Sequence, residues 1–134
     1  MSAVKREIIK YRMANAHEAL DDARFNLEHG RLKVASNRIY YAMFYANIAL
    51  LATRDISSSR HSGAISLLHE HFVRTGEFPR DLAGELALAF EMRNDTDYED
   101  HVEPDSQALQ QMLARAQEFI DRVEALIPKI LGRP

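Results

Sequence analysis

Arg93 is the residue whose type and position most strongly suggest chemistry in this sequence. It follows Phe90 by three residues and Leu86 by seven, so it continues the apolar stripe of a predicted helix. A guanidinium that faces a protein core needs partners there. In one interpretation, Arg93 ties down the acidic segment that follows it, where Asp97 lies four residues on. In the other, it is a functional cation at the mouth of a cleft, oriented by those acids.

Two polar residues stand directly before the most apolar stretch of the chain. Asn37 and Arg38 precede the segment 39–52, whose sequence is IYYAMFYANIALLA. Either they face the same cavity as Arg93, or they reach solvent from the polar start of a buried helix.

The histidines do not form a metal-ligand pattern. None of the six has a glutamate three residues before it, as the di-iron sites of helical bundles require. His69 and His71 are two residues apart, so on a helix they point about 200° from each other and cannot share one ion. His61 either caps a helix N-terminus or contacts an anion there, or it is a surface residue. We therefore expect no metal site and no cofactor.

Several classes of enzyme are excluded by what the sequence lacks. It has no cysteine, which removes disulfides, thiol nucleophiles and thiolate metal sites. It contains no Gly-Lys-Ser/Thr motif and no glycine-rich loop, which excludes ATP hydrolysis of the P-loop type. No strand–turn–helix element is predicted that would carry a serine nucleophile.

Charge is distributed unevenly along the chain. The formal net charge is -3, but residues 1–60 carry ten Lys and Arg against six acids, whereas residues 61–134 carry seven against fourteen. The segment 91–105 alone holds seven acids and one Arg. Because such a segment repels phosphate, the protein is not a generic polyanion binder.

The elements that must position these residues are all predicted to be helices. Apolar residues recur at helical spacing throughout, and no repeat or linker divides the 134 residues, so we expect one domain, residues 1–134. The segment 39–52 is apolar on most sides, which predicts a central helix that the others surround. The predicted helices span about 4–29, 32–53, 60–75 and 79–93, and a last helix begins at Pro104.

Glycine and proline mark the predicted helix ends. Gly30 and Gly76 are expected to stop the first and third helices, and Pro79 suits the first turn of the fourth. The polar segment 94–103 is predicted to be a loop. Pro128 is expected to kink or end the last helix.

Short connections favour antiparallel neighbours, so the predicted fold is all-α. We expect an up-and-down antiparallel bundle of four long helices plus one shorter helix. The longest uncharged run, between Arg38 and Arg54, has fifteen residues, fewer than the roughly 18 to 20 that span a bilayer. The N-terminus alternates charged and apolar residues, unlike a signal peptide. We expect a cytoplasmic protein with no membrane association.

Three stretches of the sequence resemble the HEPN domain. They are SNRIYYAMFYANIALL at 36–51, HSGAISLLHEHFVRTGEF at 61–78 and AFEMRNDTDY at 89–98. More narrowly, they resemble stand-alone bacterial and archaeal HEPN proteins that carry the motifs Arg-x-Tyr-Tyr-Ala, here at 38–42, and Arg-x-x-x-Asp-Tyr, here at 93–98. The likeness spans about residues 10–125.

This resemblance implies a helical bundle that is usually a homodimer and binds nucleotide or RNA. It also implies a toxin–antitoxin pair, because such proteins are often encoded beside a minimal nucleotidyltransferase. The motif residues Arg38, Asn94, Asp97 and Tyr98 then become candidates for binding the ligand or orienting the site. Tyr98 is also a candidate target for nucleotidyl transfer by the partner enzyme.

Many HEPN proteins resemble metal-independent ribonucleases whose motif is Arg, four to six residues, then His, commonly with a polar residue after the Arg. Arg93 and Asn94 match its beginning, Tyr98 falls where the His would stand after four residues, and His101 follows after seven. Arg93 would stabilise the transition state and His101 would act as base or acid. Three functions stay open: an RNA-binding or nucleotide-binding module, an endoribonuclease toxin that uses Arg93 and His101, and a non-catalytic interaction bundle.

Overall fold

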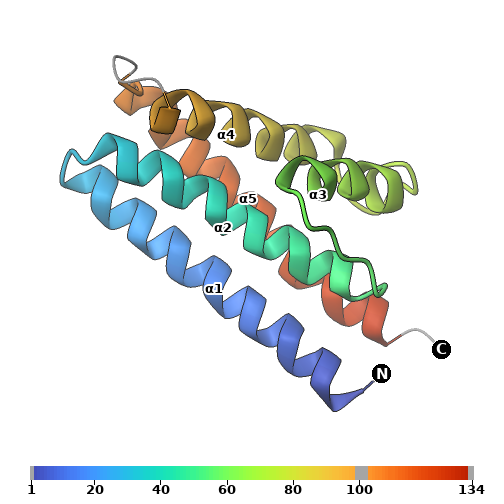
Figure 1. Ribbon diagram of the computed structural model, residues 1–134. Helices are drawn as coiled ribbons and strands as arrows, with labels where there is room; N and C mark the ends of the chain where they lie inside the picture. The colour runs from blue at the N-terminus through green and yellow to red at the C-terminus, as the bar shows by residue number, and fades with distance from the viewer. Residues whose placement is uncertain (1, 99–102, 133–134) are drawn as a thin grey trace.

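The computed structural model describes residues 2–98 and 103–132, in which four long helices run alternately up and down (Figure 1). A short helix and one π-helical turn connect the second long helix to the third. No strand occurs in this part of the chain, so the predicted all-α bundle is confirmed. The elements are α1 (Ala3–Glu28), α2 (Leu32–Ala52), α3 (His61–Leu68), the π-helical turn η1 (His69–Val73), α4 (Arg80–Tyr98) and α5 (Ser106–Leu131).

The helix α2 is the centre of the bundle, as its apolar sequence predicts. It packs against α1, α3, α4 and α5. Tyr40, Met43 and Leu50 are fully buried on it, since a helix covered on most sides excludes water from nearly every apolar side chain. Although α2 is the most apolar of the long helices, no helix in the described ranges combines the length and apolarity needed to cross a membrane.

The glycines predicted to stop the first and third helices lie where the structure ends these helical segments. Gly30 and Gly76 have φ of +72° and +81°, a conformation that other residues adopt at a cost, so they end α1 and the segment after η1. Ser2 caps α1 by accepting a hydrogen bond from the backbone N–H of Lys5 at 3.1 Å.

The predicted end of the fourth helix was wrong. We expected a loop from residue 94, but α4 continues to Tyr98. No glycine or proline interrupts residues 94–98, and Thr96 is buried with its hydroxyl donating to the carbonyl of Arg93 at 3.2 Å. Polar composition suggested a loop, whereas the buried face of Thr96 favours a further helical turn.

Three other boundaries differ from the prediction. The third predicted helix is not regular throughout, because His69–Val73 forms a π turn. The last helix begins at Ser106, where Asp105 caps it by accepting from the N–H of Gln107, so Pro104 precedes the helix. Pro128 does not end α5, which continues to Leu131. Proline lacks a backbone N–H, so at this position near the end of the helix it removes only one backbone hydrogen bond.

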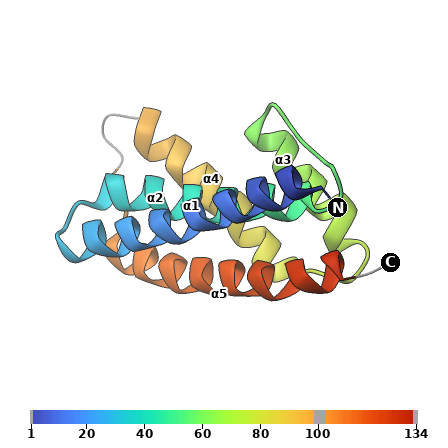
Figure 2. The same cartoon turned by 90° about the horizontal axis from the view of Figure 1, so that it is seen from below.

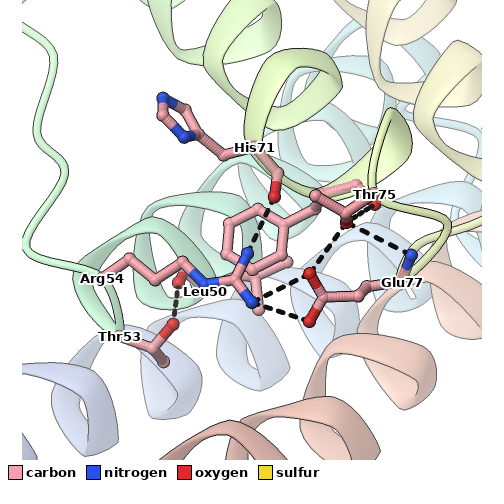
Figure 3. Close-up of polar contacts among 7 residues, drawn as sticks. Leu50, Thr53, Arg54, His71, Thr75 and Glu77 are labelled. Carbon is pink, nitrogen blue, oxygen red and sulfur yellow. Dashed lines mark hydrogen bonds and ion pairs between the residues drawn. The ribbon is translucent and has the colours of Figure 1, made fainter.

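Arg54, which lies directly after α2, holds the π turn η1 through hydrogen bonds (Figure 3). Its guanidinium donates to the carbonyl of His71 at 2.7 Å and to both carboxylate oxygens of Glu77 at 2.8 and 2.7 Å. It also lies over the ring of buried Phe72, 4.3 Å from the centroid. This fork of bonds fixes η1, and with it α3, relative to α2.

The helix α4 crosses the bundle obliquely, so that its C-terminal end stands away from α5 (Figure 2). The side chains of Phe90 and Arg93 in this half of α4 lie on the rings of α2. The packing of α4 on α2 therefore decides where Arg93 points.

Candidate functional site

The site is built on a cluster of aromatic rings where α2, α3 and α4 meet. Tyr40 of α2 is fully buried, with its ring centroid 5.1 Å from that of Tyr41 and 5.6 Å from that of Phe90 on α4. Phe44 lies one helical turn further along α2, 5.8 Å from Tyr40. These rings form a rigid surface on which polar groups from three helices are placed.

Arg93 points toward α2 and covers this surface. Its guanidinium carbon lies 5.5 Å from the ring centroid of Tyr40 and 5.4 Å from that of Tyr41. The side chain is half-buried. A cation over aromatic faces is attracted by their negative charge density, so the two tyrosines help to hold Arg93 in place. The N–H donors of a guanidinium lie at the edge of its plane, where they can bind anion oxygens.

Arg38 approaches the same ring from its own helix. Its guanidinium carbon lies 5.1 Å from the ring centroid of Tyr41, and the side-chain oxygen of Asn37 accepts from it at 3.1 and 2.8 Å. Arg38 and Arg93 therefore share one tyrosine, and a common cavity for Asn37, Arg38 and Arg93 stays a prediction. Arg38 also lines a depression of about 200 Å³ between α1 and α2, with Glu18 among its other walls.

His61 has contacts that the sequence did not predict. Its Nδ1 lies 2.7 Å from the hydroxyl of Tyr40, a hydrogen bond between residues 21 positions apart. Its ring stacks on Phe44, with centroids 4.3 Å apart and planes inclined by 18°. The sequence left His61 open as an anion contact or a surface residue, and no local pattern signals a pairing that only the packing of α3 on α2 creates.

Burial and charge act together on the two groups of this hydrogen bond. Burial lowers the pKa of His61, and the positive charge of Arg93 lowers it further. Burial raises the pKa of Tyr40 above its usual range, although Arg93 acts in the opposite direction. At neutral pH the pair is therefore a neutral imidazole and a protonated phenol beside a fixed cation.

The remaining predicted site residues follow Arg93. Asn94 is half-buried next to it on α4. Asp97 and Tyr98 lie in the last turn of α4, and their side chains are outside the described part of the structure, as is His101. The predicted pairing of Arg93 with His101 thus falls outside the described residues. Within those residues, no group of three or more His, Asp or Glu side chains is arranged to hold a metal ion.

Comparison with known proteins identifies the family. The family model of the HEPN domain matches residues 9–126, which include α2, α3 and α4 entirely. The chain belongs to the HEPN domain family. A UPF0332 protein of Thermotoga maritima is 39% identical over 123 residues, covering 92% of this chain and 93% of the relative.

Two relatives in Methanocaldococcus jannaschii carry the name "Putative toxin". One is 27% identical over 126 residues, 94% of this chain and 93% of its own length. The other is 30% identical over 90 residues, 67% of this chain and 61% of its own length. The family assignment and these names agree with a toxin-like HEPN protein.

The HEPN motif residues that the structure describes meet at one place. Arg38, Tyr40 and Tyr41 of the first motif come from α2, and Arg93 of the second comes from α4. Chemically, this arrangement offers two guanidinium groups, whose donors match phosphate oxygens, beside an imidazole that is hydrogen-bonded to a buried phenol.

Proposed function

We propose that this HEPN protein is the toxin-like member of a toxin–antitoxin pair and that it binds RNA or a nucleotide at the Arg93 site. The observation that carries the proposal is the convergence of Arg93 and Arg38 on the ring of Tyr41, at 5.4 and 5.1 Å. Both guanidiniums stand beside this one ring, and guanidinium N–H groups are donors that match phosphate oxygens.

The ligand class follows from the groups present. Guanidinium donors match phosphate oxygens in pairs, and RNA presents such oxygens along its backbone. The acids of segment 91–105 repel further phosphates, so we expect a short strand end or a single nucleotide to occupy the site, not a long duplex.

Partners are part of the proposal. The two Methanocaldococcus jannaschii relatives are named as toxins, which supports the toxin role alone. From the resemblance of the motifs we further propose a minimal nucleotidyltransferase as antitoxin, with Tyr98 as a candidate target of nucleotidyl transfer. We also propose a homodimer. In its support, α1 exposes an apolar stripe at one-turn spacing: Val4, Ile8 and Tyr11 are 69%, 41% and 68% exposed. Intact-mass measurement after co-expression with a minimal nucleotidyltransferase tests the modification.

RNA binding is tested by fluorescence anisotropy with end-labelled single-stranded RNA. Arg93→Ala should raise Kd by about 10-fold or more, because a charge-assisted hydrogen bond to phosphate is lost. Arg93→Lys should recover part of the affinity, since it keeps the charge but not the fork of donors. Arg74→Ala, at an exposed arginine after η1, is the matched control and should change Kd by less than about 2-fold. If Arg93→Ala binds the RNA as tightly as the wild type does, the proposal that RNA binds at Arg93 is wrong.

An active endoribonuclease toxin that uses Arg93 and His101 is the second candidate, favoured by the toxin names of the relatives. Expression without a partner should then arrest growth, and His101→Ala should relieve the arrest. If the protein binds no RNA and causes no arrest, the third candidate, a non-catalytic interaction bundle, replaces both.

A further inference from the structure

A polar depression adjoins the Arg93 site along the seam between α1 and α2. Arg38 lines it, and the guanidinium of Arg38 also lies over the ring of Tyr41, which it shares with Arg93. Tyr45 forms another wall, and its ring centroid lies 5.8 Å from that of Tyr41. We propose that this depression is the subsite for the base of the ligand and that it selects guanine. The inference rests on the proposed binding of RNA or a nucleotide at Arg93.

The depression has room for one small planar group and a polar lining to receive it. Its volume is about 200 Å³, several times the roughly 30 Å³ that one water takes in the liquid. All of its lining residues except Ala19 have a polar group in the side chain. They are Tyr11, Asn15, Glu18, Ala19 and Asp22 of α1, and Arg38 and Tyr45 of α2. A group that enters must therefore be matched by hydrogen bonds and not by apolar burial alone.

Two carboxylates stand on one face of α1 within this lining. Glu18 and Asp22 are four residues apart, which makes them neighbours on the surface of a helix. Both are exposed, so a ligand reaches them without any rearrangement of the core. A carboxylate only accepts hydrogen bonds, so it binds a group with adjacent N–H donors and repels a phosphate. These acids therefore favour the base, not the phosphate, as the part of a nucleotide that enters.

Guanine is the base whose edges match both walls of the depression. Its Watson–Crick edge carries two neighbouring donors, the ring N1–H and the amino group on C2, which one carboxylate of α1 accepts together. Its other edge carries O6 and N7, the pair of acceptors that an arginine binds with two parallel bonds. Adenine and cytosine have a ring acceptor beside the amino group, and uracil has a carbonyl on each side of its one N–H. Each of these three bases would leave a carboxylate facing an acceptor.

Arg38 has donors left for that pair of acceptors. Its Nε and Nη2 donate to the side-chain oxygen of Asn37 at 3.1 and 2.8 Å, which holds the guanidinium plane. Nη1 has no hydrogen bond to any residue that the structure describes. Because a guanidinium carries five N–H groups, Nη1 and the second proton of Nη2 can form the two parallel bonds. With Arg38 on the base, Arg93 holds the neighbouring phosphate.

The test compares four short RNAs that differ in one base. Fluorescence anisotropy measures Kd for end-labelled pentanucleotides UUxUU, in which x is G, A, C or U. We expect the wild type to bind UUGUU about 10-fold or more tightly than the other three, because the other bases leave hydrogen-bonding groups unpaired. Unlabelled GMP should displace the RNA better than UMP does. Comparing GMP with unlabelled UUGUU as competitors then shows whether a free nucleotide or a strand is the better source of guanine.

Substitutions in the depression test where guanine is recognised. The double variant Glu18→Ala/Asp22→Ala should bind UUGUU at most about 2-fold more tightly than UUUUU. Asp21→Ala is the matched control, since it removes the same charge at the next position, whose side chain lies outside the lining and pairs with Arg24 at 3.4 Å. It should keep the wild-type preference. Arg38→Lys keeps the charge but not the fork of donors, so it should lose most of the preference while its Kd for UUUUU changes by less than about 3-fold.

The outcomes distinguish this inference from the proposed function. If the wild type binds neither the four RNAs nor GMP, the proposed function fails and the inference fails with it. If it binds all four RNAs with the same Kd, or prefers another base, RNA binding stands and the assignment of guanine is overturned. A preference for UUGUU that persists in Glu18→Ala/Asp22→Ala, shown by circular dichroism to be folded, overturns it as well, because guanine is then recognised elsewhere.

Discussion

The hydroxyl of Tyr40 lies 2.7 Å from Nδ1 of His61 and so joins the buried middle of α2 to the first residue of α3. Tyr40 is completely buried, and a buried hydroxyl is costly unless it has a hydrogen-bond partner. The same bond therefore helps to hold α3 on the bundle and sets the direction of the imidazole.

Replacing Tyr40 with phenylalanine should lower the free energy of unfolding by about 1 kcal/mol, because one partly buried hydrogen bond is lost while the ring packing is kept. Urea denaturation measures this. Tyr45→Phe is the matched control, since Tyr45 is half-buried on α2 and its hydroxyl has no hydrogen bond in the described residues. An equal loss in both variants would show that the bond to His61 contributes nothing.

Acidification should destabilise the protein through His61. The pKa of His61 in the folded protein lies below its ordinary value of 6.5. The contribution of the neutral imidazole to the free energy of unfolding is therefore fully present above pH 6.5 and is lost as the pH falls through the folded-state pKa. The urea midpoint of the wild type should therefore drop more between pH 7.5 and 5 than that of His61→Gln. Parallel pH profiles for the two proteins would contradict the depressed pKa.

Removal of the Arg54 side chain should loosen the attachment of η1 (Figure 3). Arg54→Ala removes the nitrogen, Nη2, that donates to both oxygens of the partly buried Glu77 carboxylate, so we expect a loss of about 2 kcal/mol in the free energy of unfolding. Exposed Arg74→Ala should stay within about 0.5 kcal/mol of the wild type. Hydrogen exchange should show faster opening at residues 69–73 in Arg54→Ala and not in the control.

Two glycine substitutions should change stability in opposite directions. Gly84 lies inside α4, with open space where the Cβ of an alanine would stand, so Gly84→Ala should stabilise the protein by about 0.5 to 1 kcal/mol. Gly76 has a φ of +81°, so Gly76→Ala should destabilise it by about 1 kcal/mol. Thermal unfolding of both variants shows whether each one is more or less stable than the wild type. A change in the same direction for both would contradict the helical conformation of Gly84 or the positive φ of Gly76.

Helix order and the central place of α2 could be predicted because they depend on local rules. Apolar spacing, the glycines at 30 and 76, and the run IYYAMFYANIALLA act over one or two helical turns. The last turn of α4 could not be predicted in this way. Residues 94–98 are polar, and the burial of Thr96 that favours helix there comes from packing against the rest of the bundle.

For the site, the sequence by itself determined that Arg93 continues an apolar stripe and that Arg38 stands beside two tyrosines on a buried helix. Only the tertiary structure decided that both guanidiniums meet at Tyr41 and that His61 joins them through Tyr40. The physical reason is range. Helical periodicity fixes which face a side chain occupies, whereas contacts between α2, α3 and α4 depend on how those faces pack across tens of residues.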